Sequence, residues 1–284
     1  MSPDTTAAAR ELLAFYTDAG VDALVGEVPV DWLSAAELGS APSPQPEPDA
    51  ARTPPADAAS ARPPLSRPVI AATSATSAAP ASPDVAVMAA REAARSAASL
   101  DELRGILAQF EGCALRTTAK QLVFADGNPQ ARVMFVGEAP GREEDLEGLP
   151  FVGPSGKLLD LMMAAINLNR TTAYIANIIP WRPPGNRTPT PQESQICLPF
   201  ILRQIELANP DILVSLGGPS AQTLLGVKEG IKRTRGRWFS FHTGTREIRA
   251  IATFHPAYLL RSPLEKRLAW RDFLAVKKAL DEPR

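Results

Sequence analysis

Cysteine, histidine and aromatic residues are scarce in this chain of 284 residues. It contains two cysteines, Cys113 and Cys197, two histidines and only 6% aromatic residues. Two cysteines are too few for the disulfide framework of a small secreted protein, and two so far apart match no zinc-binding spacing. The simplest interpretation is a pair of buried thiols.

Long apolar runs are also missing. No stretch approaches the ~20 consecutive apolar residues that a membrane-spanning helix needs. The first residues, MSPDTTAAARELL, include acids and lack the apolar core of a secretory signal. We therefore expect a cytoplasmic protein without a membrane segment, and 45% apolar residues suffice for a sizeable core.

Charge is nearly balanced overall but unevenly distributed. The formal net charge is −1, yet residues 1–100 carry 12 acidic and 6 basic residues, a net of −6. Residues 228–284 carry 14 basic and 6 acidic residues, a net of +8. A basic carboxyl-terminal region favours a polyanionic partner, although an ordinary solvated surface explains the charge alone equally well.

Proline marks a linker near the amino terminus. Residues 41–83 hold 11 of the 28 prolines, with abundant alanine and serine and almost no large apolar residue. Such a segment cannot bury enough surface to offset its chain entropy. We predict a disordered linker over residues 39–84, between a small helical element at 1–38 and a main domain at 85–284.

Short β-rich runs alternate with helical patterns in the main domain. The runs are RVMFVG (132–137), AYIANII (173–179), DILVSLG (211–217) and REIRAIATF (246–254). This alternation predicts an α/β protein, a three-layer α/β/α sandwich with a central, mostly parallel four-stranded sheet. Functional sites in such folds lie beyond the carboxyl ends of the strands.

Three motifs follow predicted strands: GEAPG (137–141), NIIPWRPPGNR (177–187) and HPAYLLR (255–261). GEAPG lacks the third glycine of a dinucleotide-binding loop. The later GPSGK is followed by Leu158, where a phosphate-binding loop needs serine or threonine. The glycines therefore do not indicate a nucleotide site.

Together these motifs, extended to GEAPGREEDLEGLPFVG, NIIPWRPPGNRTPTP and HPAYLLRSP, resemble the uracil-DNA glycosylase superfamily, and most closely its family four. The resemblance covers roughly residues 110 to 280. It implies a DNA repair enzyme that flips uracil out of DNA and hydrolyses its N-glycosidic bond, leaving an abasic site. Uracil-containing DNA is then the partner, and a monomer is the simpler expectation.

The resemblance assigns the base pocket to residues from all three motifs. Phe151 matches the aromatic residue that stacks on the flipped base, and Gly137 borders the same pocket. Asn177 matches the amide that accepts from uracil N3–H and donates to O4. His255 matches the histidine that contacts uracil O2 and stabilises the developing anion.

Glu138 is the acid nearest the reacting sugar in this comparison, so it is the candidate for stabilising the oxocarbenium-like state and orienting water. Other superfamily members carry aspartate where this chain has Ala139 and an aromatic residue where it has Gly141. Asp145 is the alternative acid. The motif does not explain how thymine is excluded, which leaves Phe151 and the pocket wall as candidates.

DNA contacts are assigned to basic and apolar loop residues. Arginines suit phosphate binding, and a leucine suits a wedge that fills the gap left by the base, although packing against the core is an equally good role for one leucine. The candidates are Arg182, Arg187, Arg235, Leu259, Leu260 and Arg261.

Family-four relatives hold a [4Fe–4S] cluster on four cysteines, and the matching positions here are Phe110, Cys113, Trp181 and Cys197. An aromatic ring cannot replace a thiolate ligand. We expect that the cluster is lost, that Trp181 fills its space, and that the protein needs no cofactor or metal.

Two alternatives to the uracil-DNA glycosylase assignment stay open. One is a glycosylase for another deaminated base. The other is a protein that captures uracil-DNA without turnover. Binding of a partner protein is one role open to residues 1–38.

Overall fold

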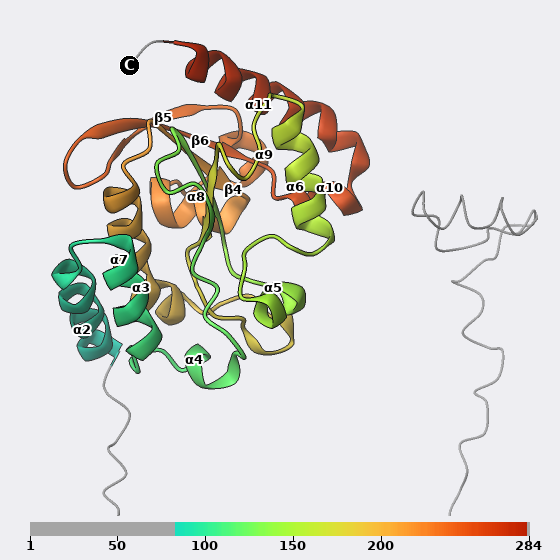
Figure 1. The fold of residues 1–284 in the computed structure, drawn as a ribbon. Helices are drawn as coiled ribbons and strands as arrows, with labels where there is room; N and C mark the ends of the chain where they lie inside the picture. Colours follow the sequence, from blue (N-terminus) through green and yellow to red (C-terminus); the bar gives the residue numbers. More distant parts are fainter. Residues whose placement is uncertain (1–82, 283–284) are drawn as a thin grey trace, which may run out of the picture. The chain divides into compact units, whose positions relative to one another are not determined.

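The computed structural model describes residues 83–282, whose helices and strands are shown in Figure 1. The predicted element at 1–38 lies outside the described residues, as does the predicted linker up to residue 82. Residues 83 and 84, assigned to the linker from composition, instead begin helix α2 (Pro83–Ser96). Proline in the first turn with an acid beside it suits a helix start.

Within the described residues, one sheet has the strand order β1-β3-β2-β4-β6-β5. The central strands, which are parallel as predicted, are β3 (Tyr174–Asn177), β2 (Val133–Gly137), β4 (Ile212–Leu216) and β6 (Glu247–Thr253). Two antiparallel edge strands, β1 (Asp126–Gly127) and β5 (Trp238–His242), extend the predicted four strands to six. β1 has only two residues and β5 is largely exposed, so neither shows the apolar run of a central strand.

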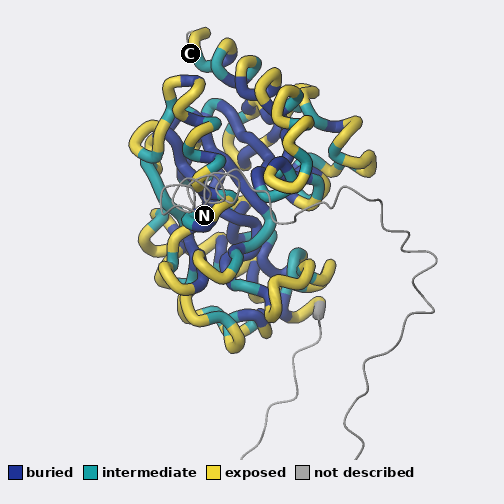
Figure 2. Tube along the Cα trace, turned by 90° about the vertical axis from the view of Figure 1, so that its right-hand side faces the viewer, coloured by how far each residue is buried: buried dark blue, intermediate teal, exposed yellow. Residues whose placement is uncertain are grey.

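Successive residues of each central strand face opposite layers. In β2, Val133 and Phe135 pack in one apolar cluster, while Met134 and Val136 pack in the other. This alternation is the ordinary consequence of a two-residue repeat, and burial on both faces explains why these strands are apolar throughout. Figure 2 shows the buried residues at the centre of the fold and the exposed ones on its outer helices.

Helices cover both faces of the sheet, which gives the expected three layers (Figure 1). One face carries α2, α3 (Leu100–Gln109) and α7 (Pro191–Ala208), with Leu224 of α8 (Gly218–Leu225) in the same cluster. The other face carries α6 (Pro154–Ala164) and α11 (Lys266–Asp281). Among the described helices, none combines the length and apolar character needed to cross a bilayer.

Short helices occupy several of the connections. They are α4 (Leu115–Thr118), α5 (Arg142–Glu147), α9 (Ile231–Thr234) and α10 (Pro256–Arg261), with 3₁₀ turns at η2 (Pro184–Asn186) and η3 (Pro263–Glu265). Two of them, α5 and α10, begin within a few residues of the ends of β2 and β6. The motif residues are therefore attached to short, fixed segments at the sheet edge.

The long helix α7 has a start encoded in its sequence. Thr190 accepts from the Glu193 N–H at 3.2 Å, and the Glu193 carboxylate accepts from the Thr190 N–H at 2.7 Å. This reciprocal pair satisfies two backbone donors of the first turn, and Pro191 occupies a position that needs no donor. The cap therefore fixes where the RPPGNR loop ends and the helix begins.

Helix α6 offers a matched test of the packing. Leu159 is fully buried against the sheet, whereas Leu161, two positions along the same helix, is 69% exposed. We predict that Leu159→Ala lowers the free energy of unfolding by about 2–5 kcal/mol, through lost burial and a residual cavity. Urea denaturation measures the change, and Leu161→Ala, expected within about 0.5 kcal/mol of the parent, is the control. Equal effects would contradict the layer assignment.

Candidate active site

The carboxyl ends of the central strands surround a cavity of about 650 Å³. Its walls come from residues 138–141 after β2, the loop after β3, the start of α8 after β4 and His255 after β6. The three predicted motifs therefore meet at one edge of the sheet, where parallel α/β folds place their sites.

Phe151 and Asn177 meet above Gly137. The pairing of β2 with β3 places Asn177 opposite Gly137. A Cβ atom at Gly137 would lie 2.7 Å from Phe151 Cζ and would overlap Asn177 Oδ1. Glycine is required here because the two side chains occupy the space that any larger residue would fill.

The amide of Asn177 has an unpaired acceptor. Asn177 is 4% exposed, and within residues 83–282 its Oδ1 has no hydrogen-bond partner. An unsatisfied buried acceptor costs about 1–3 kcal/mol, so folding alone does not account for this placement. The atom is suited to accept a hydrogen bond from a bound molecule in the cavity.

His255 is held in one tautomer. It caps α10, and its Nδ1 accepts from the Ala257 N–H at 3.1 Å, which places the proton of the neutral ring on Nε2. Burial, assisted by the positive charge of Arg261, lowers the pKa of His255 to about 4. The ring centroid lies 5.5 Å from that of Phe151. The cavity wall thus contains a neutral N–H donor.

Glu138 and Asp145 have different environments. Glu138 lines the cavity, burial raises its pKa, and within the described chain its carboxylate forms no hydrogen bond or ion pair. Asp145 is 2% exposed and lies outside the cavity, and its Oδ1 accepts from the backbone N–H groups of Lys120 and Gln121 at 2.7 and 3.2 Å. Asp145 therefore fixes a loop, and the geometry favours Glu138 over this alternative.

Two charged residues outside the predicted site, Glu144 and Arg170, shape the Phe151 loop. The buried Glu144 carboxylate accepts from the N–H groups of Gly141, Val152 and Gly153 at 3.0–3.1 Å. Arg170 donates to the carbonyls of Pro150 and Phe151. The acidic run REED contained a signal for Glu144, whereas nothing in the sequence distinguished Arg170 from a surface arginine.

Of the candidate DNA contacts, two line the cavity and two, Arg182 and Leu260, adjoin lining residues in the sequence. Arg187 and Arg261 line the cavity, and Leu260 is 44% exposed. Arg187 pairs with Glu193 through two hydrogen bonds, at 2.9 and 2.6 Å. The Arg182 Nε donates to Asn186 Oδ1 at 2.6 Å. These bonds hold both guanidinium groups in place, and the Arg182 Nη1 also lies 3.9 Å from the Asp145 carboxylate.

The structure gives packing roles to the other two candidates. Leu259 is fully buried with Phe254 and Ala269, so it anchors the loop to the core and cannot act as a wedge. Arg235 is bonded to the buried carboxylate of Asp272, and its side chain is only 14% exposed. Its donors neutralise that carboxylate, so the predicted phosphate contact is replaced by an internal ion pair.

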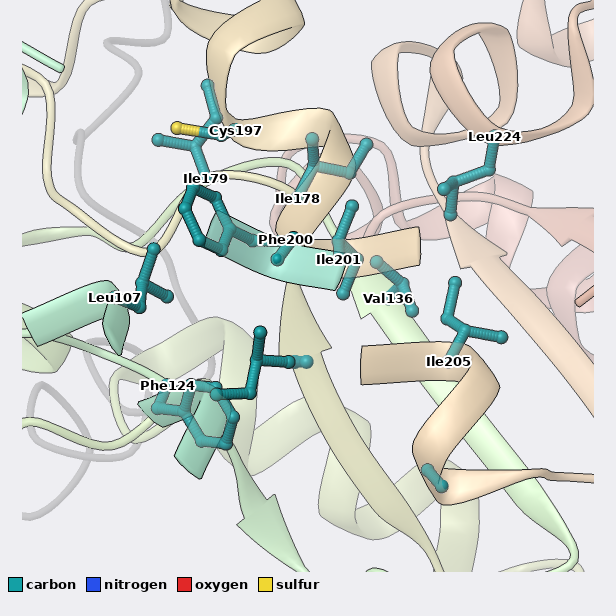
Figure 3. Close-up of a cluster of buried hydrophobic side chains, with 14 of the residues drawn as sticks. Leu107, Phe124, Val136, Ile178, Ile179, Cys197, Phe200, Ile201, Ile205 and Leu224 are labelled. Carbon is teal, nitrogen blue, oxygen red and sulfur yellow. The ribbon is translucent and has the colours of Figure 1, made fainter. Parts of the chain in front are cut away.

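The four positions that match the cluster ligands lie together in the apolar layer beside α7. Trp181 is 2% exposed, and Cys113 and Cys197 are buried with their Sγ atoms 3.9 Å apart. Phe110 packs edge-on against Phe200 with centroids 5.0 Å apart. Figure 3 shows Cys197 and Phe200 among the surrounding apolar side chains.

These residues do not fit an iron–sulfur cluster. A [4Fe–4S] cluster needs four thiolate ligands, and the whole chain has two cysteines. Within residues 83–282, no group of three or more His, Cys, Asp or Glu side chains is arranged to hold a metal ion. Aromatic side chains occupy the positions of the other two ligands.

Comparison with known proteins agrees with the geometry. The profile of the uracil DNA glycosylase superfamily matches residues 124–274. A Type-4 uracil-DNA glycosylase of Archaeoglobus fulgidus is 40% identical over 169 residues, covering 58% of this chain and 85% of the relative. The Thermotoga maritima enzyme of the same name is 42% identical over 151 residues, covering 53% and 77%. That of Saccharolobus solfataricus is 37% identical over 187 residues, covering 64% and 87%. The chain belongs to the uracil-DNA glycosylase superfamily and is similar to its family-four branch.

Proposed function

We propose that this protein binds uracil flipped out of DNA and hydrolyses its N-glycosidic bond, which releases uracil and leaves an abasic site. Membership of the superfamily and similarity to Type-4 uracil-DNA glycosylases support this DNA repair function. The observation that carries the proposal is the unpaired Oδ1 of Asn177, buried beside the Phe151 ring and facing a cavity that His255 also lines.

Base recognition follows from the donors and acceptors at this position. Asn177 Oδ1 accepts from uracil N3–H, and its Nδ2 donates to O4, while the Phe151 ring stacks on the base. Cytosine has an acceptor at N3 and an amino group at C4, so both bonds would be lost. Each mismatched buried polar group costs about 1–3 kcal/mol, which favours uracil over cytosine.

Bond cleavage uses His255 and Glu138. The His255 Nε2–H donates to uracil O2 and stabilises the anion that forms as the base departs. The Glu138 carboxylate, which no other described group holds, stabilises the oxocarbenium-like sugar and orients the attacking water. A neutral histidine and an ionised carboxylate are the forms that these roles need.

DNA binding is assigned to Arg182, Arg187 and Arg261, which contact phosphates, and to Leu260, which fills the gap in the stack. The protein acts as a monomer in the cytoplasm on uracil-containing DNA. The misfit of the cluster site supports a protein that works without iron or any other cofactor.

The central test is uracil release from an oligonucleotide that contains one uracil. Alkali-labile strand scission is expected with the parent protein. Binding without scission would contradict the proposal and favour capture of the lesion, and scission only at another deaminated base would identify a different substrate.

Within that assay, Asn177→Asp tests base choice. We expect its kcat/KM for uracil to fall by about 100-fold or more, because a carboxylate accepts hydrogen bonds but donates none to O4. Any activity that remains should shift toward cytosine. Asn128→Asp is the control, since Asn128 Oδ1 only accepts from the Gln130 N–H in a turn outside the cavity, and a carboxylate does the same. Parental activity in Asn177→Asp would contradict the account of base choice.

The pH dependence should report Glu138. Because burial raises the pKa of Glu138 in the free protein, kcat/KM should fall as the pH drops through a value above that of an ordinary glutamate. His255 stays neutral until the pH approaches about 4, so its protonation contributes only at lower pH. Glu138→Gln should lower kcat by about 10²–10⁴-fold and remove this acid limb. An unchanged limb in the variant would assign it to another group.

Iron content tests the proposed loss of the cluster. After anaerobic purification and treatment with ferrous iron and sulfide, the parent protein should retain no stoichiometric iron. The control is the double variant Phe110→Cys with Trp181→Cys, which restores the four-thiolate pattern and should gain iron. About four irons per parent chain would show that two cysteines suffice and would overturn the proposal.

A further inference from the structure

Phe151 has a backbone conformation that is unusual for its residue type. Its φ angle is +56°, in the left-handed region. The other described residues with positive φ, glycines aside, are the asparagines Asn167, Asn186 and Asn209. Asparagine adopts this region readily, whereas a bulky aromatic residue does so only where its surroundings hold it.

This conformation sets the position of the ring. The Phe151 ring lies above Gly137, beside Asn177, and 5.5 Å from the His255 ring between centroids. Asn177 ends β3 and His255 follows β6, whereas Phe151 lies in the loop between α5 and α6. Its place in the cavity therefore depends on whatever fixes that loop.

Arg170 lies in the connection between α6 and β3 and bonds to carbonyl groups of the Phe151 loop. Its Nη1 donates to the Pro150 carbonyl at 3.2 Å, and its Nη2 donates to the Phe151 carbonyl. Its Nε donates to Asp160 at 2.9 Å, and Nη1 also donates to Asp126. The rigid planar fork of arginine allows these contacts to be made at once.

The same loop is fixed from its N–H side and by close packing. Glu144 accepts from the N–H groups of Val152 and Gly153, both at 3.1 Å. A Cβ at Gly156 would overlap the Phe151 carbonyl and lie 2.9 Å from its Cα. The backbone around Phe151 is thus held on one side by a carboxylate and on the other by a guanidinium group.

We infer that Arg170 is a positioning residue for base stacking: it holds Phe151 in the left-handed conformation and thereby places the ring against the flipped base. Arg170 does not line the cavity, so it acts through Phe151 and not on the substrate. This inference rests on the proposed function, because it assumes that Phe151 stacks on uracil.

The test variant is Arg170→Gln, and Arg132→Gln is a matched control. Arg132 also bonds a carboxylate and two carbonyls, with Nε at 2.6 Å from Asp211 and its Nη atoms at 2.6 and 3.2 Å from the carbonyls of Leu280 and Glu282. It lies outside the cavity lining, next to the start of β2. Arg132→Gln removes bonds to one carboxylate and two carbonyls, whereas Arg170→Gln removes bonds to two carboxylates and two carbonyls, and only the Arg170 bonds reach Phe151.

We expect Arg170→Gln to lower kcat/KM for uracil-DNA by about 10- to 100-fold and to weaken inhibition by free uracil, since small misplacements of binding groups carry losses of this size. For Arg132→Gln, kcat/KM and inhibition by uracil should stay within about twofold of the parent. This should hold even if its thermal midpoint falls as far as that of Arg170→Gln. Equal kcat/KM in the two variants would overturn the inference.

A double-mutant cycle separates positioning from general damage. If Arg170 acts through Phe151, Arg170→Gln should cause no further loss of kcat/KM in a Phe151→Ala background. Losses that multiply would show that Arg170 acts by another route and would overturn the inference.

A crystal structure of Arg170→Gln tests the inference without an activity measurement. The inference requires the φ angle of Phe151 to leave the left-handed region or the ring to move away from His255. An unchanged Phe151 would overturn it. Absence of uracil release by the parent protein would instead refute the proposed function, and the crystal structure would still decide the role of Arg170.

Discussion

One close approach organises the site: Phe151 and Asn177 lie so near Gly137 that they leave no room for a Cβ atom there. It exists because β2 and β3 pair in parallel with Gly137 opposite Asn177, so the register of the sheet itself sets the distance. A shift of one residue in either strand would turn Asn177 toward the other layer. The stability of the sheet and the position of Asn177 thus depend on the same strand pairing, which in turn depends on apolar packing on both faces of the sheet.

Charged groups around the cavity are divided between two tasks. Glu144 and Arg170 direct their charge to backbone groups of the Phe151 loop. Glu138 is left without a partner in the described part of the chain, and burial raises its pKa. Glu144 and Arg170 are thus engaged by the fold, and in the proposed mechanism Glu138 remains available to the charge that develops during bond cleavage.

The sequence predicted the central strands because burial on both faces makes them apolar throughout, and it missed β1 and β5 because edge strands lack that pattern. Family resemblance supplied the pocket residues, which local periodicity alone could not identify. Arg235 and Leu259 were misassigned because neither charge nor hydrophobicity reveals a partner distant in sequence, here Asp272 and the core around Phe254. The φ angle of Phe151 leaves no trace in the sequence, since it is imposed by tertiary contacts.

His255 meets two demands on one ring, because its Nδ1 caps α10 while the same ring lines the cavity and carries its proton on Nε2. Asparagine could cap the helix but is too short to reach the same point, and glutamine could reach it but is a poor cap. Few substitutions at this position can satisfy both demands. Few residue types should therefore be found at position 255 among related sequences. A protein without this histidine would need another cap for α10 and another hydrogen-bond donor in the cavity.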